Sequence, residues 1–245
     1  TKGLLSLCDA LKTSWCHVSH IRLVKCSLSD DILEKLCVAI SKNISVKKLD
    51  LTGNRAGLKS FSALGNTLRA NSSLKELVLS WNKCYGSGLE AFSKGLAVNK
   101  GLRSLDLSSN LLGKVEEDSV YLSQNKGIEA LAAALSKNSS LAHLNLSDCS
   151  LNATQCELLS GGLNQNHTLV GLHFNGNKAT VDAKGFLVLQ EDSSLLRPTF
   201  SPSSEGGGGG GGGGATHFLV LVDEVPCSPE ELAALLARAG PAVTV

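Results

Sequence analysis

Several residue classes are missing from this sequence, and each absence excludes a class of protein. The 245 residues include no methionine, only 4% aromatic residues, and no apolar run of the roughly 18 to 20 residues that a membrane helix needs. No Cys-x-x-Cys pair or cysteine–histidine cluster has the spacing of zinc ligands. We therefore expect no membrane partner, no cofactor and no metal site. Because the chain begins at Thr1 and has no methionine, we expect either a fragment of a longer protein or a partial gene model.

The sequence does contain a 28-residue repeat, in which leucine, two residues, leucine, one residue, leucine, two residues and asparagine or cysteine follow one another. The six copies are Val18-Ile21-Leu23-Cys26, Val46-Leu49-Leu51-Asn54, Leu74-Leu77-Leu79-Asn82, Leu102-Leu105-Leu107-Asn110, Leu141-Leu144-Leu146-Cys149 and Leu169-Leu172-Phe174-Asn177. Their first positions are 28, 28, 28, 39 and 28 residues apart, so one insertion of 11 residues interrupts the period. A fixed period of this length indicates a solenoid of stacked units.

Each repeat is predicted to contain one strand and one helix. The apolar positions around Leu-x-Leu alternate with period two, which is typical of a strand with one buried face. Farther on the spacing becomes three and four, as in Phe61, Leu64 and Leu68, which predicts a helix with one apolar stripe. We expect the asparagine that closes each helix to adopt the left-handed conformation; these residues are Asn71, Asn99, Asn138 and Asn166.

A second set of polar residues follows the predicted strands. Their side chains can bond to backbone groups of the turn and of the neighbouring repeat, which would otherwise be buried without partners. Cysteine should serve less well here, because it is the weaker donor. These structural ladder positions are Cys26, Asn54, Asn82, Asn110, Cys149 and Asn177.

Segments such as SSLKELVLSWNKCYGSGLEAFSKGLAVN and SLAHLNLSDCSLNATQCELLSGGLNQN resemble leucine-rich repeats of the ribonuclease-inhibitor type. The resemblance implies an α/β horseshoe of about six full repeats, with parallel strands on the concave face and helices on the convex face. It implies little about function, since similar repeats occur in nuclease inhibitors, innate immune sensors, actin regulators and activators of small GTPases.

The pattern also predicts four regions. Residues 1–17 form a partial repeat with a capping helix, and residues 18–185 form the solenoid, with the insertion at 114–124. That insertion either contacts a partner or is a tolerated surface loop. Residues 186–214 are a degraded cap and linker that includes the nine glycines of 206–214. Residues 215–245 read as strand, helix and strand: either a truncated domain or an artefact of the gene model.

Cysteine placement and charge indicate the compartment and the class of partner. Cys26 and Cys149 at ladder positions, and Cys37 and Cys156 on inward helix faces, are expected to be buried, reduced thiols, which favours the cytoplasm. Four of the six Asn-x-Ser/Thr sequons lie at repeat ends, where the turn itself favours that tripeptide, so we discount glycosylation. Residues 1–100 carry a net charge of +8 and residues 101–245 a net charge of −7. Without interleaved aromatic residues, the basic half does not predict nucleic-acid binding.

Side chains that flank the strand leucines are the candidate binding residues on the concave face. The candidates are Arg22, Lys25, Asp50, Val78, Trp81, Asp106, Asn145, Asp148 and His173. Trp81 either anchors a partner or packs over Gly53. Asp50 and Asp106 lie two repeats, or roughly 10 Å, apart, which is wide for paired-carboxylate catalysis. His20, His143 and His173 read as surface histidines rather than metal ligands.

No catalytic group of residues emerges from the sequence. We therefore predict a monomeric, non-catalytic module that binds a partner protein on its concave face. The alternative is a GTPase-activating protein that acts through loop residues, for which Arg55, next to Asn54, is the one candidate.

Overall fold

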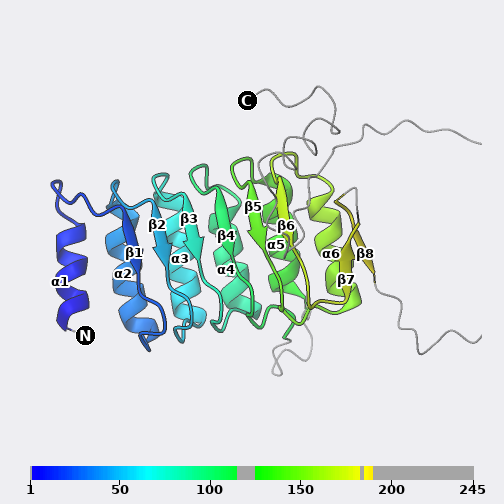
Figure 1. Ribbon diagram of the computed structural model, residues 1–245, viewed down its shortest axis with the longest axis horizontal. Coiled ribbons are helices and arrows are strands. Elements are labelled where there is room, and N and C mark those ends of the chain that lie inside the picture. The colour runs from blue at the N-terminus through cyan, green and yellow to red at the C-terminus, as the bar shows by residue number, and fades with distance from the viewer. Residues whose placement is uncertain (1, 115–124, 183–184, 190–245) are drawn as a thin grey trace, which may run out of the picture.

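The computed structural model of the chain describes residues 2–114, 125–182 and 185–189, and it has a layer of helices beside a layer of strands (Figure 1). The helices are α1 (Lys2–Leu11), α2 (Asp30–Lys42), α3 (Leu58–Ala70), α4 (Gly86–Leu96), α5 (Lys126–Lys137) and α6 (Ala153–Leu163). The strands are β1 (His20–Arg22), β2 (Lys48–Asp50), β3 (Glu76–Val78), β4 (Ser104–Asp106), β5 (His143–Asn145), β6 (Gly171–His173), β7 (Ala179–Val181) and β8 (Leu187–Leu189).

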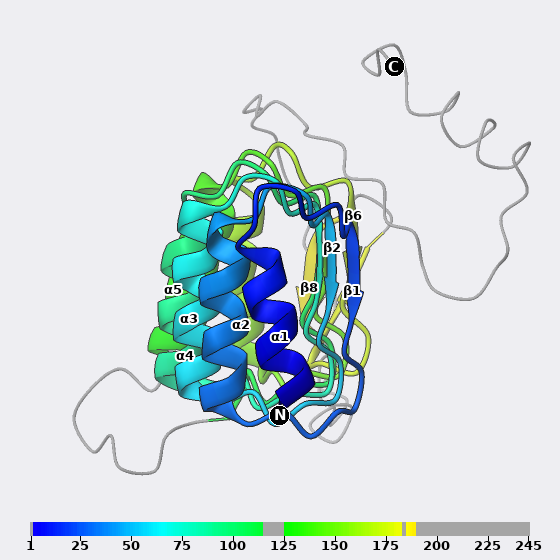
Figure 2. The same ribbon diagram turned by 90° about the vertical axis from the view of Figure 1, so that its left-hand side faces the viewer.

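Strands β1 to β6 form one parallel sheet in chain order. The second apolar residue of each repeat pairs with its counterpart in the next, as Leu49 does with Leu77. The register is unchanged across the insertion, because Leu105 still pairs with Leu144. Seen from the N-terminal end, the helices lie on one side and the strands on the other (Figure 2). The predicted α/β solenoid is confirmed.

The core lies between the two layers. Strand leucines such as Leu49 and Leu77 and helix leucines such as Leu96 have no exposed surface. Phe61 of α3 and Phe92 of α4 meet edge to face, with their ring centroids 5.8 Å apart. Since each unit buries its apolar side only against its neighbours, stability depends on stacking.

Glycines allow neighbouring helices to approach each other closely. A Cβ added to Gly95 of α4 would lie 1.9 Å from the carbonyl oxygen of Gly65 in α3. One added to Gly162 of α6 would lie 2.3 Å from the carbonyl oxygen of Ala132 in α5. Side chains at these two positions would therefore force the helices apart.

The left-handed conformation predicted for the asparagines after the helices is wrong. Asn71 and Asn138 have φ of −105° and −71°, so they are extended rather than left-handed. The Nδ2 of Asn71 donates to the carbonyl oxygens of Ile40 (2.8 Å) and Asn43 (2.7 Å) in the preceding repeat. Its Oδ1 accepts from the backbone amides of its own loop. Tertiary hydrogen bonds, rather than helix closure, fix these side chains.

This arrangement forms a second asparagine ladder, at the opposite edge of the solenoid from the ladder predicted after the strands. Its members are buried and make equivalent bonds: Asn43, Asn71, Asn99, Asn138 and Asn166. Four of the six sequons fall on it, and a buried amide that already donates hydrogen bonds to the preceding repeat is inaccessible to glycosylation.

The described chain ends in a hairpin rather than a helix. Strands β7 and β8 pair antiparallel, and β8 packs against α6. The predicted boundary between residues 185 and 186 falls between the two strands of this hairpin. Most of the insertion at 114–124, the nine glycines of 206–214 and the segment 215–245 lie outside the described residues.

Candidate functional site

The asparagines that follow the strands hold the edge of the candidate binding face in place. Asn54 donates from Nδ2 to the carbonyl oxygens of Leu23 (2.6 Å) and Leu51 (2.9 Å). Its Oδ1 accepts from the amide of Leu28, 3.2 Å away in the preceding repeat. Asn82, Asn110 and Asn177 make the equivalent bonds to the preceding strand. Each such residue thus ties its own turn to the repeat before it.

The two cysteines of this ladder differ from each other. The Cys149 thiol is buried, 3.3 Å from the carbonyl oxygen of Leu107, and burial raises its pKa to about 12. Cys26 is exposed, so the expectation of a buried thiol is wrong there. The reason is its position: β1 is the edge strand of the described sheet, and no earlier strand among the described residues covers Cys26 or supplies carbonyl groups.

The residues immediately before the ladder share one backbone conformation that the sequence analysis missed. All six have φ between 51° and 75°, in the left-handed region: Lys25, Gly53, Trp81, Ser109, Asp148 and Gly176. For a non-glycine residue this conformation costs roughly 1 to 2 kcal/mol. Backbone bonds to the next repeat hold it, as from the amide of Trp81 to the carbonyl oxygen of Ser108 (3.1 Å). The glycines at positions 53 and 176 were the one sign in the sequence of this left-handed conformation.

Trp81 stands out in this row because 68% of it is exposed. The space beside Gly53 is filled by Lys25, whose Cγ would lie 2.7 Å from an added Cβ. The left-handed turn thus presents a large aromatic surface to solvent at the end of β3.

The acidic candidates are largely committed to their own turns. Asp50 Oδ1 accepts from the amide and the hydroxyl of Thr52, at 3.0 and 2.7 Å. Asp106 bonds in the same way to Ser108, at 2.8 and 2.6 Å. The Asp50 side chain is only 13% exposed, and its Oδ2 lies 3.3 Å from Nε of Arg22, which is itself 79% exposed. These carboxylates therefore stabilise the turns of the candidate binding face, and less of their charge is available to a partner.

The remaining candidates are placed on the same face, with Val78, His173 and Asn145 at the ends of their strands. Asn145 Oδ1 accepts from the amide of Ser147 (3.0 Å), which repeats the turn of Asp50. Asp148 lies over Gly176, where an added Cβ would meet its Oδ1 at 2.0 Å. Among the candidate residues, exposed hydrophobic surface therefore comes mainly from Trp81 and exposed basic surface from Arg22 and Lys25.

A search of the described residues for chemistry finds little. No group of three or more His, Cys, Asp or Glu residues there could hold a metal ion. No helix in that part of the chain is long and apolar enough to cross a bilayer. Arg55, the candidate for GTPase activation, is exposed in the turn between β2 and α3.

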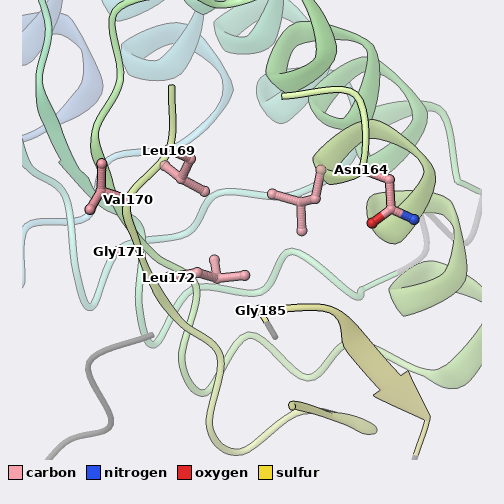
Figure 3. A pocket seen from close by; sticks show the side chains of 7 residues that line it. Asn164, Leu169, Val170, Gly171, Leu172 and Gly185 are labelled. Atoms are coloured by element: carbon pink, nitrogen blue, oxygen red, sulfur yellow. The ribbon is translucent and has the colours of Figure 1, made fainter. Parts of the chain in front are cut away.

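A small cavity and an open groove lie among the described residues. The first holds about 10 Å³, roughly one water, between the end of α6, strand β6 and Gly185 (Figure 3). The second is an open groove of about 450 Å³ between α2 and α3, flanked by Val38 and Leu58. Its one thiol, Cys37, is buried, and burial raises its pKa to about 12, so it is a poor nucleophile.

Comparison with known proteins agrees with this architecture. Residues 70–93 match the family model described as a leucine-rich repeat. A 67-residue stretch, 27% of this chain, is 36% identical to human NACHT, LRR and PYD domains-containing protein 5, and the match spans 6% of that protein's length.

Two solved structures share the fold. The actin-binding site 2 structure of leiomodin-1 has a TM-score of 0.50 at 21% identity, covering 65% of this chain and 89% of that one. The tropomodulin C-terminal domain of Caenorhabditis elegans has a TM-score of 0.51 at 15% identity, covering 66% and 92%. With the parallel sheet and the helix layer, these likenesses define an α/β leucine-rich-repeat solenoid.

Proposed function

We propose that the chain is a non-catalytic binding module that holds a partner protein against the strand face, the surface formed by β1 to β6 and the turns that follow them. Leucine-rich repeats generally mediate protein–protein interaction, which supports this class. The partner would contact Trp81 and the exposed Arg22, with the remaining candidate residues around them.

The exposed ring of Trp81 is the observation that carries the proposal. Tryptophan is among the residues that most often dominate binding energy at protein interfaces. Here 68% of it is exposed although its turn is fixed by backbone bonds, so a partner would bury it without first ordering the loop.

Affinity capture from cell extract with three versions of the chain tests the proposal. A true partner is captured by the unmodified chain, is lost with Trp81→Ala, and is retained with Val38→Ala, a control on the helix layer that is 54% exposed. A partner captured equally by all three versions would exclude the strand face. Purified actin is a defined probe for the same experiment, because leiomodin-1 is described as having an actin-binding site.

We further propose that the repeats are of the ribonuclease-inhibitor type, on the support of the 28-residue period and full helices on the outer layer.

We propose a cytoplasmic location, supported by the free thiols of Cys37, Cys84, Cys149 and Cys156 in the core. Expression of a tagged chain followed by fractionation and thiol labelling checks the location: recovery from a secretory compartment with oxidised thiols would contradict it.

The alternative, activation of a small GTPase through Arg55, has a direct assay. Accelerated GTP hydrolysis by a candidate GTPase that is lost with Arg55→Ala would support it. Unchanged hydrolysis, or acceleration that persists in the variant, would end it.

A further inference from the structure

One edge of the solenoid is rich in positive charge. The loops that join α2 to β2, α3 to β3 and α4 to β4 lie side by side along the upper edge in Figure 1. These loops, with the helix ends before them, comprise residues 41–47, 69–75 and 97–103, called here the cationic ridge. Each segment contains two basic residues and no Asp or Glu. The six basic residues, all exposed, are Lys42, Lys47, Arg69, Lys75, Lys100 and Arg103.

Half of these side chains are held in place by loop carbonyls. Lys47 Nζ donates to the carbonyl oxygen of Ile44 (2.9 Å). Lys75 Nζ donates to the carbonyls of Ser72 (3.1 Å) and of Gly101 (3.2 Å) in the next loop. Arg103 Nη1 likewise reaches the carbonyl of Ser140 (2.8 Å). A lysine has three donors and an arginine five, so each retains donors for a ligand while its head group is already oriented.

Helix ends alone do not account for this charge. Basic residues are favoured near helix C-termini, where each helix presents about half a negative charge. Three helices end at the ridge, so they contribute about −1.5 against six cations. None of the six forms an ion pair with a carboxylate of the described residues, whereas the basic residues Arg22, Lys48 and Lys59 outside the ridge do.

The ridge is also partly apolar. Ile44 is 77% exposed between Lys42 and Lys47, and Val98 is 55% exposed beside Lys100. Both side chains are therefore open to contact with a ligand. A ligand for this edge would therefore bring negative charge and apolar groups in alternation.

We propose that the cationic ridge binds an acidic, leucine-containing segment of a protein partner, lying in an extended conformation across the three loops. Neighbouring strands lie about 4.8 Å apart and alternate residues of an extended chain about 6.6 Å apart, so successive carboxylates can reach successive loops. This site is distinct from the strand face, because the ridge lies where the strands begin and Trp81 lies where β3 ends.

Two other anionic partners fit less well. Single-stranded nucleic acid requires aromatic platforms between the cations, and the three loops contain no aromatic residue. A membrane surface is bound most tightly where a continuous apolar stripe accompanies the basic charge. Ile44 and Val98 instead lie two loops apart, separated by Ser72 and Ser73 of the middle loop.

Fluorescence anisotropy with a labelled peptide of about twelve residues, built from repeated Glu-Glu-Leu, tests the proposal. The ridge variant combines Lys42→Gln, Arg69→Gln and Lys100→Gln. The control removes equal charge at the opposite edge with Arg55→Gln, Lys83→Gln and Lys114→Gln. We expect roughly tenfold weaker binding by the ridge variant and less than about twofold by the control. Trp81→Ala should leave peptide affinity unchanged, which separates this site from the strand face.

Two further ligands complete the test: a Gln-Gln-Leu peptide of equal length, and vesicles of phosphatidylcholine with phosphatidylserine. We expect the Gln-Gln-Leu peptide and the vesicles both to bind the chain less tightly than the acidic peptide. It is overturned if both triple variants lose affinity equally, if the Gln-Gln-Leu peptide binds as well, or if the vesicles or a single-stranded RNA compete for the ridge at lower concentration.

Discussion

The carboxylate of Asp30, in the first turn of α2, accepts a hydrogen bond from the hydroxyl of Ser60 in the first turn of α3. The same carboxylate oxygen also accepts from the amide of Gly57 at 2.7 Å. Gly57 is the N-cap of α3 and has no side chain to cap the helix, so the preceding repeat supplies the cap. Asp30 therefore joins two repeats while it stabilises the start of α3.

Replacing Asp30 with alanine should destabilise the fold by about 0.5 to 2 kcal/mol, the usual cost of losing an N-cap. Asp30→Asn should lose less, because its amide oxygen still accepts a hydrogen bond. Urea unfolding followed by circular dichroism measures both. Equal stability of Asp30→Ala and the unmodified chain would show that the cap contributes nothing.

The Asp30 cap should also weaken in acid. Partial burial raises the pKa of this carboxyl, but hydrogen bonds from the Ser60 hydroxyl and from the amides of Gly57, Lys59 and Ser60 outweigh it, so the pKa falls below its ordinary 3.8. A lowered pKa stabilises the fold above pH 3.8 and loses that effect as the pH falls through the native value. The stability difference between the unmodified chain and Asp30→Asn should therefore shrink below pH 3.8; a constant difference would contradict it.

Neighbouring glycines of α6 should respond oppositely to alanine. At Gly161 an added Cβ meets nothing within 4 Å, so Gly161→Ala should stabilise the helix by about 0.5 to 1 kcal/mol. At Gly162 the Cβ would collide with the carbonyl of Ala132, so Gly162→Ala should destabilise by about 1 to 3 kcal/mol. Thermal unfolding of the two variants provides the comparison. Changes of the same sign would mean that the α5–α6 contact is looser than described.

The second asparagine ladder should contribute measurably to stability. Asn71→Ala leaves the amides of Ser73 and Leu74 and two carbonyls of the preceding repeat without their partner, at a cost of about 1 to 3 kcal/mol. Asn66, which is exposed on α3, the helix that Asn71 follows, is the matched control. Asn66→Ala should change stability by less than about 0.5 kcal/mol. Chemical denaturation distinguishes them, and equal midpoints would refute the ladder's role.

Thiol reactivity should separate the cysteines by burial. Cys26 is exposed and should react first with a maleimide at neutral pH. Cys37 and Cys149 should react only after unfolding, because burial excludes the reagent and raises each pKa to about 12. Peptide mapping by mass spectrometry identifies the modified sites. Labelling of Cys149 in the folded chain would imply local opening of the fourth and fifth repeats.

The repeat period was enough to predict the strand leucines, the helix stripes and the positions after each strand. It could not predict what depends on neighbours. Cys26 has the same local sequence pattern as Cys149, yet it is exposed because β1 is the edge strand of the described sheet. Likewise, Asn71 has a high intrinsic tendency towards left-handed turns, but its bonds to the preceding repeat hold it extended.

Some features of the candidate binding face could have been predicted from the sequence. Asp50 and Asp106 each stand two residues before Thr or Ser, a spacing typical of a side chain that bonds to its own turn. The left-handed row was signalled by Gly53 and Gly176, but nothing in the local sequence of Trp81 indicates the same conformation. That inference requires the stacked neighbours, whose backbone bonds impose one turn on six different residues.

The unchanging register of the sheet has a consequence for recognition. A translation of one repeat carries each strand onto its neighbour, so a partner that read only the backbone could bind at several offsets with equal affinity. Trp81 is the one aromatic residue in its row, so a partner that contacts its ring would bind at one offset only. A contact with this single side chain would therefore fix which repeat the partner binds.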